Sequence, residues 1–120
     1  MKSVLITGAE RNSGLGIARK FFKEGWSVVI TSRDDAEIKA VAADLDKEFG
    51  IPCYGFQYSP LDAITDAPKL FEKIDEKGIE LDSVVCVAAD LGRLMDPLTV
   101  DPQAWANVLT TNVVGYFMPA

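Results

Sequence analysis

The sequence contains no histidine, and its 120 residues include two cysteines, Cys53 and Cys86. Without histidine, this chain alone cannot form a Ser-His-Asp triad, a Cys-His pair or a histidine-ligated zinc site. Two isolated thiols cannot complete a zinc or iron–sulfur site by themselves, so we expect no metal site. We interpret both cysteines as small buried hydrophobic residues rather than as the two halves of a disulfide.

Basic residues and long apolar runs are also scarce. Lys and Arg number 12 against 18 Asp and Glu, which gives a net charge of −6. A net acidic chain without a basic cluster is a poor candidate for binding nucleic acid or anionic membrane surfaces. No apolar run approaches the about 18–20 residues of a membrane span, and the apolar stretch at the N-terminus is too short for a signal peptide. We therefore expect a cytoplasmic protein with no nucleic-acid and no membrane partner.

Strand-like and helix-like segments alternate along the chain. Continuous apolar or β-branched runs predict strands at residues 4–6, 26–31, 53–58 and 83–88. Apolar residues at helical spacing predict helices over residues 14–24, 34–49 and 64–77, and a fourth from residue 101 onward. This order predicts a parallel sheet with right-handed crossovers. The expected fold is therefore α/β, a doubly wound, Rossmann-like sheet with strand order 3-2-1-4.

The predicted helices carry start signals and apolar faces. Asp34 and Glu37 resemble a capping box, and Asp101 followed by Pro102 resembles an N-cap with proline at the first helical position. The spacing of apolar residues predicts an inner face for the third and fourth helices. The expected inward residues are Ile64, Ala67, Leu70, Phe71 and Ile74 in the third helix, and Trp105, Val108, Leu109, Asn112 and Val113 in the fourth.

A glycine-rich turn, residues 7–16, joins the first strand to the first helix. Small residues there let the backbone approach a pyrophosphate, and the helix N-terminus offers free N–H groups and the positive end of its dipole. The position between a predicted strand and helix is the context that such a motif requires. Gly16 is at least as well explained by close packing of helix on strand as by contact with a ligand.

At this turn the chain resembles the short-chain dehydrogenase/reductase family. Thr7, Gly8, Gly14, Leu15 and Gly16 match the ends of its Thr-Gly-x-x-x-Gly-x-Gly motif, although five residues separate the first two glycines where the family usually has three. The resemblance implies binding of a nicotinamide dinucleotide at this turn. It leaves open which of the residues from Glu10 to Ser13 faces a phosphate. The expected cofactor-binding residues of the turn are Gly8, Arg11, Asn12, Ser13, Gly14 and Leu15.

The end of the second predicted strand bears on the choice of dinucleotide. Ser32 occupies the position where a ribose-binding carboxylate favours NAD, and Arg33 follows it. Together with Arg11, these residues favour NADP, because a guanidinium pairs with the 2′-phosphate. The alternative is that Asp34 or Asp35 binds the ribose, which would favour NAD. Capping of the second helix is our preferred role for these acids, so NADP is the expected cofactor and NAD stays possible.

The resemblance continues after the fourth strand. Val87, Ala88 and Ala89 stand in the family's Asn-Asn-Ala-Gly segment, whose small residues pass beneath the cofactor, although neither asparagine is kept. The following helix matches the family's Trp-(x)6-Asn-x-x-Gly-x-Phe pattern, which nominates Asn112 as an active-site residue acting through its main chain and a bound water. The loop over residues 90–95 lies where substrates approach an open α/β sheet.

The residues that do the family's chemistry are missing from these 120 residues. No Tyr-x-x-x-Lys motif occurs, and the sequence ends inside the fourth predicted helix. We therefore expect residues 1–120 to be the N-terminal portion of one NAD(P)-binding domain whose catalytic C-terminal part is absent. The leading hypothesis is an NADP(H)-dependent oxidoreductase that transfers hydride to a carbonyl or from an alcohol, homo-oligomeric at full length. Alternatives are a non-catalytic dinucleotide sensor or interaction module, and a non-functional fragment.

Overall fold

A parallel sheet forms the centre of the molecule. The computed structural model describes residues 1–89 and 101–120. Its four strands are hydrogen-bonded in the order β3-β2-β1-β4, which confirms the predicted order and the doubly wound α/β class. The pairing is parallel throughout, with Leu5 opposite Val29 on one side and opposite Val84 on the other. The strands are β1 (Ser3–Thr7), β2 (Ser27–Ser32), β3 (Cys53–Gln57) and β4 (Ser83–Cys86).

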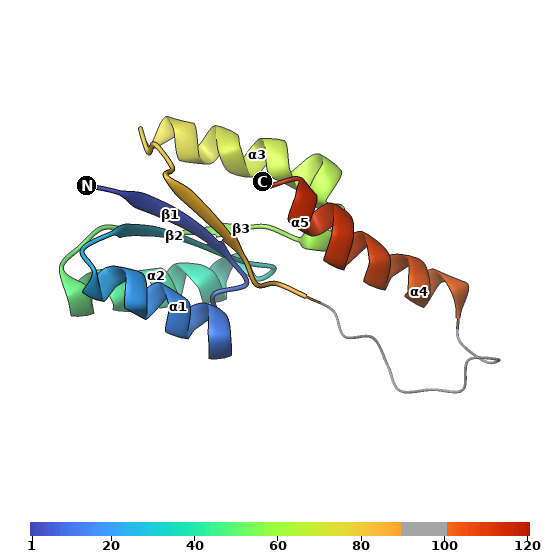
Figure 1. Ribbon diagram of the computed structural model, residues 1–120, viewed down its shortest axis with the longest axis horizontal. Coiled ribbons are helices and arrows are strands. Elements are labelled where there is room, and N and C mark those ends of the chain that lie inside the picture. The colour runs from blue at the N-terminus through green and yellow to red at the C-terminus, as the bar shows by residue number, and fades with distance from the viewer. Residues whose placement is uncertain (90–100) are drawn as a thin grey trace.

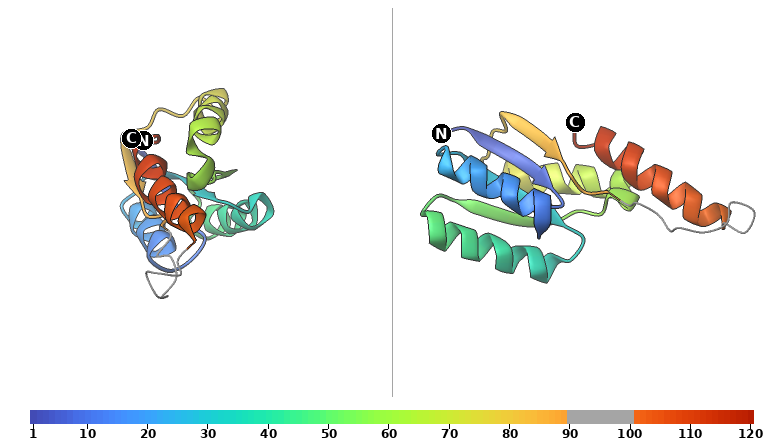
Figure 2. Two further views of the ribbon diagram at one scale, coloured as in Figure 1. Left: turned by 90° about the vertical axis from the view of Figure 1, so that its right-hand side faces the viewer. Right: turned by 60° about the horizontal axis from the view of Figure 1, so that its bottom comes forward.

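Helices cover both faces of this sheet. The helices α1 and α2 lie on one face and α3 on the other, while α4 extends past the carboxyl ends of the strands (Figures 1 and 2). No helix within residues 1–89 and 101–120 is long and apolar enough to cross a membrane. The helical segments are α1 (Asn12–Lys23), α2 (Asp35–Phe49), η1 (Pro60–Asp62), α3 (Ala63–Glu76), α4 (Pro102–Leu109), the π-helix η2 (Thr110–Val114) and α5 (Gly115–Phe117).

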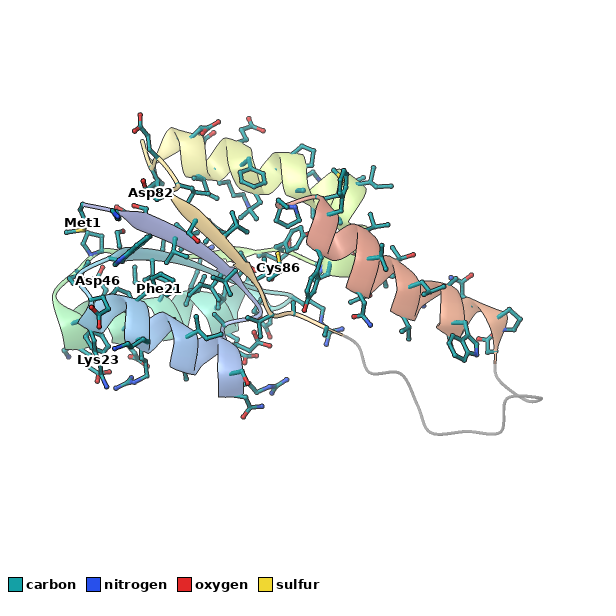
Figure 3. All side chains as sticks on the ribbon, in the orientation of Figure 1. Met1, Phe21, Lys23, Asp46, Asp82 and Cys86 are labelled. Carbon is teal, nitrogen blue, oxygen red and sulfur yellow. The ribbon has the colours of Figure 1, made fainter. Side chains whose placement is uncertain are left out.

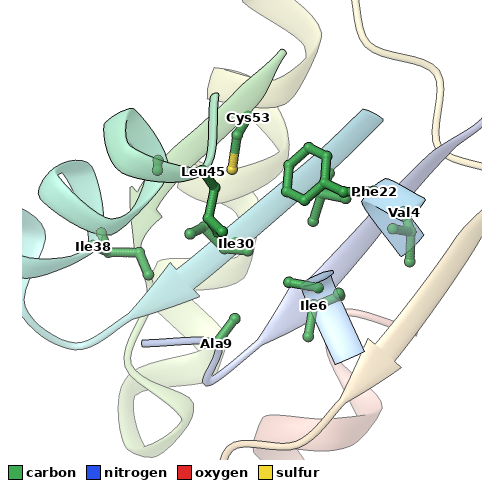
Figure 4. Packing of buried hydrophobic residues seen from close by; sticks show 11 residues of the cluster. Val4, Ile6, Ala9, Phe22, Ile30, Ile38, Leu45 and Cys53 are labelled. Carbon is green, nitrogen blue, oxygen red and sulfur yellow. The ribbon is translucent and has the colours of Figure 1, made fainter. Parts of the chain in front are cut away.

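Alternate residues of the central strands supply two separate hydrophobic layers. Val4, Ile6 and Ile30 belong to the layer beneath α1 and α2, which Figure 4 shows from close by. Leu5 and Val29 point the other way and pack with the buried residues of α3. This alternation is the two-residue period of a strand, and both faces are apolar because both are covered by helices. The continuous apolar runs of the sequence reflect that double burial.

The start and end of α2 follow the sequence signals. The Asp34 carboxylate accepts a hydrogen bond from the Glu37 N–H at 3.1 Å, so Asp34 is the N-cap. The Asp34 N–H donates to the Ser32 hydroxyl at 3.0 Å, a bond that Glu37 would accept in a complete capping box. Gly50 ends the helix in the left-handed conformation, with φ of 66°.

Two predicted helix faces are wrong in part. Ile64 is 71% exposed, because the buried positions of α3 are Ala63, Ala67, Leu70 and Ile74, about a quarter-turn away. In the fourth helix Trp105, Leu109 and Val113 are exposed rather than inward. Most of α4 lies beyond the strand ends, and the residues that pack against the core, Val114 and Met118, follow α4 in the chain (Figure 1).

The two cysteines differ in burial. Cys53 is buried in the layer beneath α1 and α2, as predicted, and burial raises the pKa of its thiol to about 12. Cys86 is half-buried at the end of β4, so the expectation of burial holds only in part. Both thiols are free, and the two residues lie in β3 and β4, the two edge strands of the sheet.

Candidate functional site

The turn between β1 and α1 depends on two glycines for its shape. Gly8 has φ of 69°, and a Cβ atom on it would lie 2.7 Å from the Ala88 Cα. A Cβ on Gly14 would lie 2.1 Å from the Gly8 carbonyl oxygen. The absence of both side chains therefore lets the first turn of α1 rest on the end of β1, and lets β1 meet the chain after β4.

Gly16 does not have the packing role that the sequence suggested. It is exposed on α1, and a Cβ on it would meet no atom of residues 1–89 and 101–120 within 4 Å. The close approach of helix to strand occurs one turn earlier, at Gly14, because that residue faces the β1 carboxyl end. A close backbone contact therefore requires glycine at position 14 but not at position 16, and the spacing of the motif does not reveal this difference.

The N-terminus of α1 presents hydrogen-bond donors. Arg11 is the N-cap residue in extended conformation, and a guanidinium cannot accept hydrogen bonds, so its side chain cannot satisfy the first turn. Asn12 begins the helix with φ of 53°, a left-handed conformation that asparagine tolerates better than most residues. The N–H groups of this turn, with the positive end of the helix dipole, suit an anion such as a phosphate.

At the end of β2 a buried hydroxyl stands next to an exposed arginine. Ser32 is 6% exposed, whereas Arg33 is exposed to solvent. The turn is tied back to β1, because the Thr31 carbonyl oxygen accepts hydrogen bonds from the N–H groups of Gly8 at 3.0 Å and Ala9 at 3.1 Å. These bonds hold the glycine turn and the end of β2 side by side.

The chain after β4 is fixed to the same edge of the sheet. Val87 N–H donates to the Thr7 hydroxyl at 3.2 Å, and Ala88 N–H donates to the Thr7 carbonyl oxygen at 3.2 Å. Thr7 is 1% exposed, so its hydroxyl forms a buried hydrogen bond that holds the segment after β4 against β1. This threonine is the first residue of the glycine motif.

These segments line one cleft with a volume of about 790 Å³. That volume lies within the range of about 300–1,000 Å³ typical of ligand sites. Leu15 does not line the cleft; it packs against the core beneath α1. The cleft-lining residues that the sequence had nominated are Gly8, Arg11, Asn12, Ser13, Gly14, Ser32, Arg33, Val87, Ala88 and Ala89. Contact of these residues with a cofactor stays a prediction.

Sequence reasoning missed one wall of the cleft. This wall follows β3, and Asp66 holds it in place because its carboxylate accepts a hydrogen bond from the Ser59 N–H at 3.0 Å. The carboxyl ends of parallel strands share one edge, so the predicted end of the third strand was a usable signal. The lining residues of this wall are Tyr58, Ser59, Pro60 and Leu61, and the cleft is also lined by Glu10 of the glycine turn, Asn107 of α4 and Thr111 of η2.

Asn112 lies in the π-helix η2, where the Gly115 N–H donates to the Thr110 carbonyl oxygen five residues back. Asn112 is half-buried and is not among the lining residues, whereas its neighbour Thr111 is. Single π turns inside helices occur frequently at functional sites. The proposed catalytic role of Asn112 stays a prediction, and the predicted substrate loop over residues 90–95 lies outside the described residues.

A tyrosine and a cysteine meet beneath the C-terminal end of the fourth helix. The Tyr58 hydroxyl donates a hydrogen bond to the Gly115 carbonyl oxygen at 2.9 Å. Burial, followed by the nearby Cys86 and Asp66, raises the pKa of Tyr58 to about 12, so the hydroxyl keeps its proton at neutral pH. Burial also raises the pKa of Cys86, which makes its thiol a poor nucleophile. Figure 3 shows Cys86 at the end of β4, beside α5.

Comparison with known proteins gives consistent results. A short chain dehydrogenase/reductase, dpfgG of Gibberella zeae, is 30% identical over 112 residues, covering 93% of this chain and 40% of that protein. The 3-oxoacyl-[acyl-carrier-protein] reductase FabG of Aquifex aeolicus is 29% identical over 119 residues, covering 98% of this chain and 46% of that protein. The chain thus spans less than half the length of these two relatives.

The fold is shared with solved structures. A protein described as a short chain dehydrogenase from Escherichia coli CFT073, crystallised with NADPH, superposes with a TM-score of 0.86 at 28% identity. The match covers 98% of this chain and 50% of that one. A family model described as short chain dehydrogenase matches residues 2–120. Nearly the whole sequence therefore fits that model, and the chain belongs to the short chain dehydrogenase family.

Proposed function

We propose that this chain is the cofactor-binding part of an NADP(H)-dependent oxidoreductase. The substrate class is a carbonyl or the corresponding alcohol. In this proposal, residues 1–120 form the N-terminal portion of one dinucleotide-binding domain. The observation that carries the proposal is the cleft, which brings the N-terminus of α1, the end of β2 and the chain after β4 together at one edge of the sheet. Ligands of open α/β sheets bind at that edge.

The residues of the cleft fit a dinucleotide by their chemistry. The N–H groups of Asn12, Ser13 and Gly14 start α1 and suit the pyrophosphate, because they add to the positive end of the helix dipole. Gly8 and Ala88 have no side chain beyond Cβ, so the backbone of both can approach a ligand closely. Ala89 and Val87 continue this small-residue floor. A nicotinamide dinucleotide bound there would donate or accept the hydride.

The preference for NADP(H) rests on charge at the end of β2. Arg33 lines the cleft beside Ser32, and Arg11 lines it from the glycine turn. Two guanidinium groups suit a 2′-phosphate, and the serine hydroxyl can hydrogen-bond to it. Of the two competing ribose ligands, Asp34 is the N-cap of α2 and Asp35 pairs with Lys39. These contacts support NADP over NAD.

Asn112 is proposed to support the reaction rather than to perform it. Its place in the π turn, next to Thr111 in the cleft wall, supports a role in holding groups near the nicotinamide through the main chain. The sequence contains no Tyr-x-x-x-Lys pair, so these 120 residues supply binding and positioning.

Replacement of Arg33 by alanine tests the cofactor assignment. We expect Arg33→Ala to weaken NADPH binding about tenfold, because a charge-assisted hydrogen bond to the 2′-phosphate is lost. Binding of NADH, which lacks that phosphate, should change by less than about twofold by the same reasoning. Both dissociation constants are measured by fluorescence titration of the purified chain.

Arg19→Ala is the matched control. Arg19 lies on α1 but forms an ion pair with Glu48 of α2 rather than lining the cleft. Its removal should leave both dissociation constants unchanged. Equal loss of NADPH and NADH affinity in Arg33→Ala would contradict recognition of the 2′-phosphate by Arg33. Tighter binding of NADH than of NADPH by the unmodified chain would overturn the choice of cofactor.

A further inference from the structure

The segments α4, η2 and α5 follow one another without a break from Pro102 to Phe117, and we call them the α4–η2–α5 helix. One carbonyl group of this helix has no helical hydrogen-bond donor. In an α-helix the Gly115 oxygen would accept from the N–H of residue 119, but residue 119 is proline, which has none. Met118 keeps helical dihedral angles, with φ of −64° and ψ of −40°, so the nitrogen of Pro119 stands where the donor would be. Gly115 and Pro119 are both buried, so this oxygen needs a donor from elsewhere in the protein.

Tyr58 supplies that donor. Its hydroxyl lies 2.9 Å from the Gly115 oxygen, and the residue is 1% exposed. Because the contact is buried, water cannot replace the tyrosine, and loss of the hydroxyl leaves the carbonyl unsatisfied. The tyrosine follows β3, whereas Gly115 lies 57 residues later. The hydrogen bond therefore joins the third strand to the last helix.

Two further contacts join the C-terminal end of this helix to η1 and to the end of β4, and we call this region the junction. A Cβ atom on Gly115 would lie 2.5 Å from the Pro60 Cβ and 2.9 Å from the Pro60 carbonyl oxygen, so the helix backbone packs directly on η1. The Cys86 thiol donates to the Tyr116 carbonyl oxygen at 3.7 Å, a weak bond from the end of β4. These contacts lie at the C-terminal end of the helix, while most of α4 extends away from the sheet (Figure 1).

This junction sets the position of one wall of the cleft. Asn107 and Thr111 line the cleft from the helix, two turns and one turn before Gly115. Tyr58 and Pro60 line it from the other side of the junction. A shift of the helix relative to η1 would therefore move lining residues on both sides.

We propose that Tyr58 is a positioning residue for dinucleotide binding. Its hydroxyl replaces the amide proton that Pro119 lacks and thereby holds the α4–η2–α5 helix against η1 in the geometry of the cleft. The inference rests on the proposed function for the identity of the ligand. The hydrogen bond and its effect on the helix can be tested without any ligand.

Tyr58→Phe removes the hydroxyl and keeps the ring. We expect amide hydrogen exchange in residues 114–118 to accelerate about tenfold in the ligand-free chain. The dissociation constant for NADPH should rise at least about threefold, because a smaller fraction of molecules holds the helix in the binding position. Tyr54→Phe is the control, since it removes a hydroxyl near the start of β3, whereas Tyr58 follows the end of that strand. It should change neither quantity.

Pro119→Ala provides a rescue that a mere packing role would not show. This substitution restores an N–H four residues after Gly115, so the Tyr58 hydroxyl becomes redundant. In the Pro119→Ala background, Tyr58→Phe should change exchange and NADPH affinity by less than about twofold. An equal loss in both backgrounds, or unchanged exchange in Tyr58→Phe alone, would overturn the inference.

A different result would contradict the proposed function. If the unmodified chain bound neither NADPH nor NADH, the proposed function would be wrong together with the binding part of this inference. The exchange measurements would still decide whether Tyr58 fixes the helix. If the unmodified chain bound NADPH and Tyr58→Phe bound it equally well, the proposed function would stand and the positioning role would be wrong.

Discussion

Gly14 is the position where the glycine turn tolerates a side chain least. Gly14→Ala would place a Cβ 2.1 Å from the Gly8 carbonyl oxygen and 2.8 Å from the Ala9 Cα. Contacts of a Cβ below 3.0 Å essentially never occur. Both neighbours are backbone atoms, which cannot rotate away as a side chain could. The first turn of α1 must therefore move by about 1 Å away from β1.

This displacement should affect stability and binding together. Overpacking of this kind costs about 3 kcal/mol, which lowers the melting temperature of a domain of this size by about 12 °C. The N–H groups that begin α1 move with the helix, so the affinity for NADPH should fall at least about tenfold. Thermal unfolding followed by circular dichroism gives the first quantity. A fluorescence titration with NADPH, at a temperature where the variant is folded, gives the second.

Gly16→Ala is a control two residues away on the same helix. A Cβ at this position meets no atom of the described part of the chain within 4 Å, and alanine forms helix better than glycine by about 1 kcal/mol. This variant should therefore melt up to about 4 °C higher than the unmodified chain and bind NADPH equally well. Equal melting temperatures for Gly14→Ala and Gly16→Ala would refute the assignment of the close contact to Gly14.

Two other predictions concern stability. Asp34→Ala should lower the free energy of unfolding by about 1 kcal/mol, because α2 loses its N-cap. Asp35→Ala should lower it by less than about 0.5 kcal/mol, because only an exposed ion pair is lost. If Asp34→Ala abolished NADH binding, Asp34 would be the ribose ligand. Burial raises the pKa of Cys53 from 9.0 and of Tyr58 from 10.0, both to about 12, so the folded state keeps protons that the unfolded state releases. The free energy of unfolding in urea should therefore fall as the pH rises from about 9 towards 12, and a constant value would contradict the burial of these groups.

The sequence predicted the sheet well because the strands are buried on both faces. The continuous apolar run at Val4 to Ile6 and the β-branched run of β2 identify strands that are covered by helices on both faces. The ends of α2 were also predictable, since Asp34 caps the helix through its own side chain and Gly50 ends it through its own φ. These signals are local, because the residues that start and end the helix are the ones that predict where it starts and ends.

The remaining differences depend on contacts between distant segments. The π turn at Asn112 coincides with a junction to Tyr58 and Pro60 that no local pattern reveals. Gly14 and Gly16 are alike in sequence, but Gly14 approaches the backbone of Gly8 and Ala9, which lie at the end of β1. The wall after β3 was missed because its residues match no known motif, although its place at the carboxyl edge of the sheet was predictable.

We propose that the cleft at the carboxyl edge of this sheet binds NADP(H) in preference to NAD(H). Isothermal titration calorimetry of the 120-residue chain with NADPH and with NADH measures this preference. We predict one site per chain, with NADPH binding at least about tenfold more tightly than NADH, as the recognition of a 2′-phosphate by Arg11 and Arg33 requires. Tighter binding of NADH, or no binding of either dinucleotide, would contradict the claim.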